Sequence, residues 1–283
     1  MENAHAMTVE ALEARSRLIR TPVAYTRGWL EWRIWGEGPP LVLIHGGHGS
    51  WTHWIRTIPA LSRHFTVVAP DLPGYGSSDP PASGVADPDE FARLLGDGLS
   101  AVIGDGRFGL VGFSFGGVVA GHLAALIPDR VRRLVLIGAG GLGLPRPPPP
   151  ALVKWAALPA SQQPEAHRAN LAAVMIADPS RIDDLALHLQ AENTRRARLR
   201  SRSVSVTDTL RRKLAEARVP LAGIWGTCDA MTGEHIETRR KLLLEFDPYA
   251  PFLAVEGAGH WVAYEEPNAV EHALISWMDT PKY

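Results

Sequence analysis

The sequence has a single cysteine, Cys228, among its 283 residues, so no disulfide can form within the chain. A chain without disulfides suits a reducing compartment, and we expect a cytoplasmic location. The first residues lack a basic segment followed by an apolar core, so we expect no secretory signal. No apolar run approaches the ~20 residues that a membrane-spanning helix needs, and we expect no membrane partner.

The sequence also lacks an excess of charged residues of either sign. Lys and Arg number 29 against 30 Asp and Glu, which leaves a formal net charge of -1. No overall field therefore favours nucleic acid or anionic lipid, and a small molecule is the expected partner, with a homodimer left open as the assembly. The His and Asp residues show no spacing typical of a metal site, so we expect no metal.

Short apolar runs and helical patterns alternate along most of the chain. Strands are predicted at 18–23, 30–35, 41–44, 65–69, 108–111, 131–137, 221–225 and 251–255. Helices are predicted between and after them, at 52–62, 88–103, 118–126, 234–246 and 267–277. From residue 41 onward the alternation predicts an α/β fold, in which a mostly parallel central sheet is flanked by helices.

The alternation stops after residue 143. The run PRPPPP at 145–150 predicts a stiff linker, and the following stretches at 163–177, 179–198 and 207–217 have helical patterns. We therefore expect residues 144–217 to be a helical cap, or lid, inserted before the strand at 221–225. Residues 1–143 and 218–283 would form the core.

The segment RFGLVGFSFGGVV, residues 107–119, contains a G-x-S-x-G pattern. An apolar strand leads into Gly112 and an apolar helix follows Gly116, which puts Ser114 at the apex of an abrupt turn. Small residues on both sides let the chain fold back and raise the Ser114 hydroxyl above the carboxyl edge of the sheet. We predict that Ser114 is a nucleophile. The alternative is a structural Gly-rich turn with an incidental serine.

A serine nucleophile needs a base and a group that holds the base. His260, in GAGHW, directly follows the last predicted strand, and Asp229, in WGTCD, follows the strand before it. The order Ser114, Asp229, His260 is the one expected for this architecture. Asp71, in DLPGYGSS, competes with Asp229, but an Asp before Pro and Gly usually holds its own turn. More remote alternatives are Glu234 and Asp208.

The oxyanion of a tetrahedral intermediate needs two hydrogen-bond donors already in place. We predict one donor to be the backbone N–H of Phe115, at the start of the helix after the turn. The other is the N–H of Gly47 in the HGGHGS turn, with the N–H of a neighbouring residue as the alternative. Glycine at that place lets bare backbone approach a substrate.

Four side chains are candidates for a substrate pocket. His48 and Trp51 either line an acyl pocket or pack a helix against the sheet. Trp261 lies in a predicted loop, where its aromatic surface would line a pocket. Phe113, with Phe115, makes the turn apolar around the serine, which favours an apolar acyl group. A basic run in the cap either meets a substrate carboxylate or forms a solvated face: Arg195, Arg196, Arg198, Arg200 and Arg202.

Together, the motifs HGGHGS, APDLPGYGSSD, GFSFGG, WGTCD and GAGHW, in this order, resemble those of the α/β-hydrolase fold family. The resemblance runs from residue 25 to the C-terminus, apart from the cap. It implies a cofactor-free enzyme that forms an acyl-enzyme on Ser114, deacylated by a water that His260 activates. The dehalogenases and epoxide hydrolases of this fold have Asp at the elbow, and this chain has Ser114.

Within this fold, the chain is similar to small esterases and to hydrolases that cleave a carbon–carbon bond in meta-cleavage products. The latter share the Gly-His-Trp run at 259–261 but have a polar residue where Phe113 stands, Gly-Pro-Gly in the oxyanion turn and Val-Pro after the acid. We expect a carboxylesterase-like serine hydrolase of a small, apolar ester, thioester or lactone. The alternatives are a carbon–carbon bond hydrolase of the 2-hydroxy-6-oxo-dienoate type and a non-catalytic ligand receptor.

Overall fold

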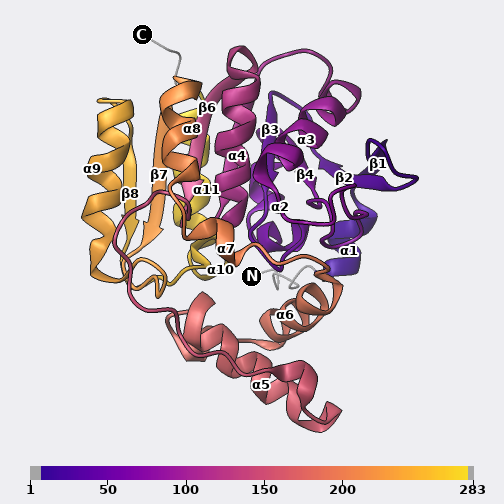
Figure 1. The fold of residues 1–283 in the computed structure, drawn as a ribbon, viewed down its shortest axis with the longest axis vertical. Coiled ribbons are helices and arrows are strands. Elements are labelled where there is room, and N and C mark those ends of the chain that lie inside the picture. The colour runs from indigo at the N-terminus through magenta and orange to yellow at the C-terminus, as the bar shows by residue number, and fades with distance from the viewer. Residues whose placement is uncertain (1–7, 280–283) are drawn as a thin grey trace, which may run out of the picture.

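The computed structural model describes residues 8–279, in which a sheet of eight strands is covered by helices on both faces (Figure 1). The strand order across the sheet is β1-β2-β4-β3-β5-β6-β7-β8. β1 and β2 pair antiparallel, and β3 to β8 run parallel, so the predicted α/β fold with a mostly parallel sheet is confirmed. The strands are β1 (Arg17–Pro22), β2 (Trp29–Trp35), β3 (Pro40–Ile44), β4 (Thr66–Pro70), β5 (Phe108–Phe113), β6 (Val131–Ile137), β7 (Leu221–Gly226) and β8 (Phe252–Val255).

Successive side chains of a buried strand face opposite sides of the sheet, and each side has its own core. In β3, Val42 and Ile44 belong to the core under α3, α4, α8 and α9, whereas Leu41 and Leu43 belong to the core under α1, α2, α10 and α11. Within residues 8–279 no helix has the length and apolar character needed to cross a membrane. The helices are α1 (Val9–Ala14), α2 (Ile58–Leu61), α3 (Pro88–Ile103), α4 (Phe115–Leu126), α5 (Gln163–Asn170), α6 (Asp184–Arg196), α7 (Arg202–Ser205), α8 (Thr209–Ala217), α9 (Ile236–Phe246), α10 (Val262–Glu265) and α11 (Pro267–Asp279).

Two stretches predicted as continuous helices are broken in the structure. The stretch at 52–62 consists of a 3-10 turn, Trp51–Trp54, and the short helix α2. Pro59 has no N–H to donate and would collide with a preceding carbonyl, so a continuous helix cannot pass through it. The stretch at 179–198 begins as a 3-10 turn and becomes α6 only after Asp183, whose side chain accepts a hydrogen bond from the N–H of Ala186.

The segment after β6 leaves the sheet and returns to it at β7. Figure 1 shows α5 and α6 standing beyond the end of the sheet at which β7 terminates. The division of the chain into a core and a cap at 144–217 stays a prediction. Within that range, α8 packs against α4, because Leu210 and Leu214 share the core of Val118 and Leu210 lies directly over Gly121. α8 is therefore part of the helix layer that covers the sheet.

Candidate active site

Ser114 lies between β5 and α4, in a backbone conformation that residues with a side chain rarely adopt (φ 53°, ψ -117°). Its N–H donates to the carbonyl of Ile137 on β6 (2.8 Å), which fixes the turn to the neighbouring strand. A Cβ on Gly112 would lie 2.5 Å from the carbonyl oxygen of Gly116, and one on Gly116 would collide with that of His45. Close packing of backbone therefore requires both glycines of the G-x-S-x-G pattern.

Ser114, His260 and Asp229 form one hydrogen-bonded chain. The Oγ of Ser114 lies 2.9 Å from Nε2 of His260, and Nδ1 of His260 lies 2.9 Å from Oδ2 of Asp229. A carboxylate only accepts, so this geometry assigns the proton of the neutral imidazole to Nδ1 and leaves Nε2 to accept from the serine hydroxyl. His260 and Asp229 are both buried.

The carboxylate of Asp229 has further partners in its own loop. Oδ1 accepts from the N–H of Met231 (2.7 Å), and Oδ2 accepts from the hydroxyl of Thr232 (3.3 Å) as well as from His260. These bonds orient the carboxylate toward the imidazole.

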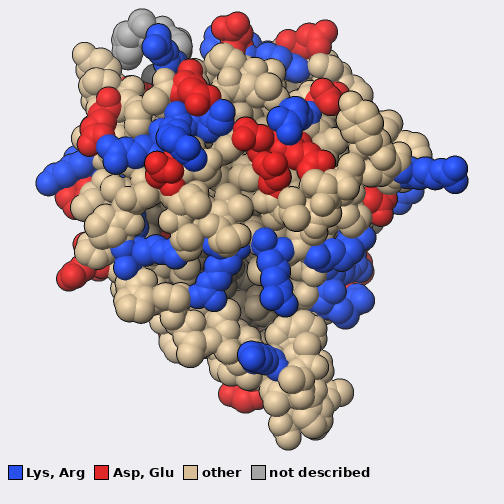
Figure 2. Space-filling model, viewed as in Figure 1, with Lys and Arg blue, Asp and Glu red and all other residues tan. Residues whose placement is uncertain are grey.

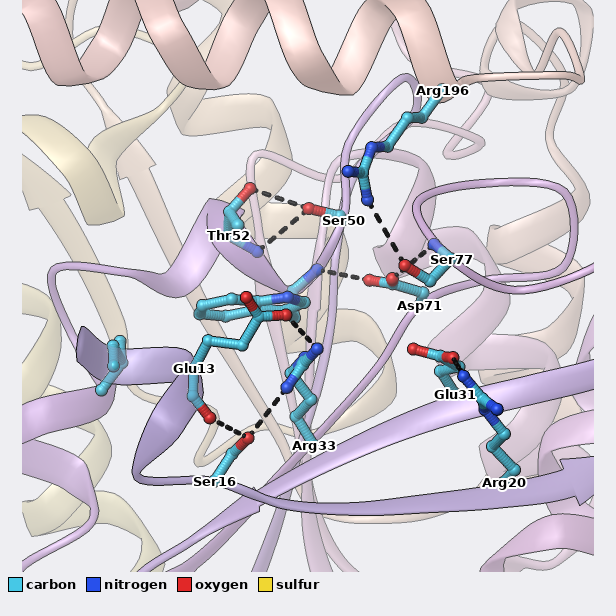
Figure 3. A network of polar contacts seen from close by, with 12 residues as sticks. Glu13, Ser16, Arg20, Glu31, Arg33, Ser50, Thr52, Asp71, Ser77 and Arg196 are labelled. Carbon is cyan, nitrogen blue, oxygen red and sulfur yellow. Dashed lines mark hydrogen bonds and ion pairs between the residues drawn. The ribbon is translucent and has the colours of Figure 1, made fainter. Parts of the chain in front are cut away.

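Asp71, the competing carboxylate, is held by two different loops (Figure 3). Its Oδ1 accepts from the N–H of Trp51 (2.8 Å), and its Oδ2 accepts from the N–H of Ser77 (2.8 Å). Burial raises the pKa of Asp71 to about 6, and the two hydrogen bonds oppose that rise. Asp71 holds the loop after β4 as expected, and it also ties that loop to the turn after β3.

The loop that carries His260 is held by a buried glutamate that the sequence interpretation did not identify, Glu265. Its Oε2 accepts from the N–H of Gly259 (2.7 Å), and its Oε1 accepts from the N–H groups of residues 177–178 (3.0 and 3.4 Å). Burial raises the pKa of Glu265 against the effect of these three bonds. One carboxylate therefore connects the loop of His260 to the segment that precedes α6.

The turn after β3 lies against the start of α4. The N–H of Gly46 donates to Nδ1 of His53 (3.2 Å), so this amide already has an acceptor. Gly47 faces Phe115, since a Cβ added to it would lie 3.7 Å from Cβ of Phe115. Phe115 is the first residue of α4, where an N–H has no acceptor within the helix. The added Cβ on Gly47 would also collide with Oγ of Ser201.

The four predicted pocket residues lie in different surroundings. His48 is exposed and has a positive φ of 52°. Trp51 packs on a tryptophan of β2 (ring centroids 5.2 Å apart), and Trp261 stacks on a tyrosine of α10 (4.2 Å). Phe113 packs against the ring of His260 (5.0 Å). Trp51, Phe113 and Trp261 are all buried.

A cavity of about 50 Å³ lies beside Ser114 and His260. None of the four predicted pocket residues lines it. Two arginines that the sequence interpretation missed, Arg146 and Arg239, do line it. The rest of its wall comes from the turn after β6, the end of α7 and the loop after β7, at residues 138–144, 205–207 and 231–232.

The position of Arg239 could have been found in the sequence. It is buried on α9 together with Leu242 and Leu243, so a basic residue occupies the apolar stripe of an amphipathic helix. Arg146 lies in the proline-rich linker and carries no comparable signal.

The basic run at 195–202 is used in part to hold α6 to the loop after β4. Arg195 forms an ion pair with Glu192 within α6 (2.6 Å), and Arg196 donates to the hydroxyl of Ser77 (3.4 Å; Figure 3). Arg198 donates to the carbonyl oxygen of Ser78. Part of the run thus joins α6 and the segment after it to the loop that follows β4.

A buried amide also joins α6 to the turn after β3. The Oδ1 of Asn193 accepts from the hydroxyl of Ser50 (2.8 Å), and its Nδ2 donates to the hydroxyl of Thr52 (3.0 Å). Ser50 and Thr52 also bond to each other (2.8 Å; Figure 3). α6 is therefore fixed next to the turn that contains Gly47.

Several known proteins are similar to this chain. The 2-hydroxy-6-oxo-2,4-heptadienoate hydrolase of Pseudomonas putida is 42% identical over 110 residues, which are 38% of this chain and 40% of that protein. The protein YfhM of Bacillus subtilis, of the AB hydrolase superfamily, is 26% identical over 270 residues, 86% of this chain and 91% of that one. The match with the Pseudomonas hydrolase thus spans about two fifths of that relative's length.

Solved structures share the fold. A meta-cleavage product hydrolase from Pseudomonas fluorescens superposes with a TM-score of 0.73 at 24% identity, over 89% of this chain and 94% of that one. An esterase from Rhodococcus superposes with a TM-score of 0.73 at 21% identity, over 94% and 99%. Residues 41–273, most of the chain, match the model of the alpha/beta hydrolase family. The chain therefore belongs to the alpha/beta hydrolase family, and its hydrogen-bonded serine, histidine and aspartate lie at the sheet edge of that fold.

Proposed function

We propose that the protein is a serine hydrolase that cleaves a small ester, thioester or lactone through an acyl-enzyme on Ser114. The observation that carries this proposal is the hydrogen-bonded chain from Ser114 through His260 to Asp229, with both links at 2.9 Å. A serine hydroxyl becomes a useful nucleophile only with such a base and such an orienting acid.

In the proposed reaction, Oγ of Ser114 attacks the substrate carbonyl while Nε2 of His260 takes its proton. Asp229 holds the Nδ1–H tautomer and stabilises the imidazolium that forms. His260 then gives the proton to the leaving group. A water, deprotonated by the same nitrogen, attacks the acyl-enzyme and releases the acid, so that Ser114 regains its proton.

The developing oxyanion would accept hydrogen bonds from the N–H groups of Gly47 and Phe115. Gly46 already donates to His53, and this supports Gly47 as the donor from the turn after β3. The two amides belong to residues that face each other beside the elbow. Each donor of this kind typically contributes ~10²–10³ in rate.

The expectation of an apolar acyl group loses its basis. Phe113 packs against His260, and Phe115 packs against Tyr75 and Phe91 in the core, so neither ring faces the cavity. The walls of that cavity include two arginines and several hydroxyl groups.

A second candidate is the hydrolysis of a carbon–carbon bond in a dienoate. Two relatives, 42% and 40% identical over segments of about 110 residues, bear the names 2-hydroxy-6-oxo-2,4-heptadienoate hydrolase and 2-hydroxymuconate semialdehyde hydrolase. The same three residues would serve this reaction, with the leaving group a stabilised carbanion that His260 protonates.

The test compares the wild type with Ser114→Ala and, as a matched control, with Ser100→Ala, because Ser100 is exposed on α3. We expect Ser114→Ala to lose fluorophosphonate labelling and to hydrolyse p-nitrophenyl butyrate at least ~10³-fold more slowly, with folding intact. Ser100→Ala should keep both the labelling and the hydrolysis. Turnover retained in Ser114→Ala would refute the assignment.

A panel of substrates separates the candidates. Decolorisation of a yellow ring-fission dienol faster than hydrolysis of any ester in the panel would favour carbon–carbon cleavage. Labelling of Ser114 without turnover of any ester or dienol would favour a ligand receptor on the same fold.

A further inference from the structure

We propose that Arg239 and Arg146 form a subsite that binds a carboxylate of the substrate, in the cavity beside Ser114. The inference rests on the proposed function and names its substrate class. The substrate would be an ester, thioester or lactone that also carries a carboxylate, several bonds from the carbonyl that Ser114 attacks.

The first observation is the unpaired charge of Arg239. The residue is 5% exposed, and no carboxylate of residues 8–279 forms an ion pair with it. One nitrogen, Nη1, donates to the carbonyl oxygen of His235 (3.0 Å) and to the hydroxyl of Thr238 (3.2 Å). A guanidinium has five N–H donors and stays charged in proteins, so most of its binding capacity is left for another partner. Buried charges are normally paired.

The nearest acid does not supply that partner. Asp229 uses both carboxylate oxygens for Met231, Thr232 and His260. Burial lowers the pKa of Arg239, the charge of Asp229 opposes this, and the charge of Arg146 lowers the pKa further. Two cations therefore lie close enough to repel each other, next to an acid that is already committed.

The second observation is the composition of the cavity wall. Arg146 and Arg239 are charged side chains that accompany Ser114 and His260 there, and among residues 8–279 no Asp or Glu lines the cavity. The hydroxyl-bearing residues Ser205, Thr207 and Thr232 contribute to the same wall. A planar guanidinium matches a carboxylate through two parallel hydrogen bonds, so this wall suits a ligand with a carboxylate.

The third observation is the surface around the site. The chain carries a formal net charge of -1, yet Figure 2 shows Lys and Arg side chains in a row across the face where the cap meets the helix layer of the sheet. A local concentration of positive charge attracts anions from solution and raises their rate of encounter.

The experiment compares two esters with the same leaving group: mono-p-nitrophenyl glutarate, which carries a carboxylate, and p-nitrophenyl valerate, which is neutral. We expect Arg239→Met and Arg146→Met each to lower kcat/KM for the glutarate ester at least ~10-fold and to change that for the valerate ester less than ~2-fold. The matched control is Arg240→Met, because Arg240 is exposed on α9 and pairs with Glu237 (3.7 Å). Arg240→Met should leave the ratio of kcat/KM for the glutarate ester to kcat/KM for the valerate ester unchanged.

A third ester, 4-butyryloxybenzoate, carries its carboxylate on the leaving group. A lower kcat/KM for either anionic ester, relative to the neutral ester, in the arginine variants supports the subsite. The ester that is affected tells on which side of the scissile bond the carboxylate lies. If Arg146→Met leaves kcat/KM unchanged for both anionic esters, the subsite is refuted, and this result stands even if Arg239→Met does not fold.

A binding measurement keeps this inference separate from the proposed function. Glutarate should bind to Ser114→Ala in calorimetry, and the added Arg146→Met substitution should weaken that binding ~10-fold. Fluorophosphonate labelling of the wild type with no binding of glutarate and no selectivity would refute the subsite alone. Binding of glutarate without labelling or turnover would refute the hydrolase alone.

Discussion

The two sides of the cleft at Ser114 differ in packing and in charge. On one side, the oxyanion wall (residues 45–54) is filled by buried imidazoles and is tied down by Asp71 and Asn193. On the other side, the acid wall (residues 138–146 and 229–239) encloses empty space and carries two arginines. Under the proposed function this difference is useful, because rigidity would hold the two oxyanion amides in place and the open side would leave room for substrate groups.

The imidazoles of the oxyanion wall act as neutral packing groups. Nδ1–H of His45 donates to the carbonyl of Gly46 (2.7 Å), while its Nε2 accepts from the N–H of Leu72 (2.8 Å). Burial lowers the pKa of His45 to about 4, and burial first, then nearby imidazoles, lower that of His53 well below its usual range. These two buried imidazoles therefore stay neutral near neutral pH. The charged side chains beside Ser114 lie on the acid wall instead.

The two buried aspartates provide the strongest test of this difference, because each follows a strand on a different side of Ser114. We expect Asp229→Asn to lower kcat ~10⁴-fold, since an amide stabilises the wrong tautomer of His260. Asp71→Asn should cost stability, because an amide nitrogen would face the N–H of Trp51 or Ser77. Esterase kinetics measure kcat of both variants, and urea unfolding measures their stability. An equal loss of kcat in Asp229→Asn and Asp71→Asn would contradict the different roles of the two aspartates.

The second test adds one methyl group to the oxyanion wall. In Gly47→Ala the new Cβ would collide with Oγ of Ser201, so the turn must shift and move its amide. We expect kcat to fall by up to ~10²–10³, the usual effect of losing one oxyanion donor. Removing the obstacle in Gly47→Ala/Ser201→Gly should restore part of the rate. Steady-state kinetics of the single and double variants decide this, and no recovery would argue against steric displacement.

The smallest effect concerns pH. His45 has a pKa of about 4 when folded and 6.5 when unfolded, so the unfolded chain binds more protons between these values. The stability that His45 contributes is present above pH 6.5 and is lost as pH falls through 4. This difference between the pKa of His45 in the folded and the unfolded chain corresponds to about 3 kcal/mol of stability.

The measurement is the free energy of unfolding in urea at pH 7.5 and 4.5 for the wild type and His45→Gln. The wild type should lose about 3 kcal/mol more than the variant on acidification. Comparison with the variant is needed because Asp71, whose pKa is raised to about 6, changes stability in the opposite direction over nearly the same range. If the free energy of unfolding changed with pH by the same amount in the wild type and in His45→Gln, the role of His45 would be contradicted.

The sequence predicted the strands well because a buried parallel strand is a local pattern. The bounds predicted for β6, 131–137, are those of the structure, and the strand expected at 41–44 gains only Pro40. Helices interrupted by proline were less predictable. Pro59 lies in the first turn of α2, and its missing N–H prevents one continuous helix from running through 52–62 despite the apolar pattern there.

The site likewise has residues that a local pattern predicts and residues that only the fold brings together. The sequence pointed to Ser114, Asp229 and His260 because each follows a strand in a short motif, and the structure places them within hydrogen-bonding distance. The lining of the cavity depends instead on which loops meet in space. Arg146 and Arg239 lie far apart along the chain and meet at one cavity. Trp51 and Trp261 were predicted pocket residues because they lie in or beside loops, and both are buried in the structure.

The backbone of Ser114 has a consequence for how this chain tolerates mutation over time. A positive φ of 53° is comfortable for glycine and costs other residues about 1–3 kcal/mol, so glycine in place of Ser114 would remove this strain. Under the proposed function, selection for stability would favour glycine at this position, whereas selection for turnover would keep serine. An inactive descendant of this gene would be expected to gain glycine there early.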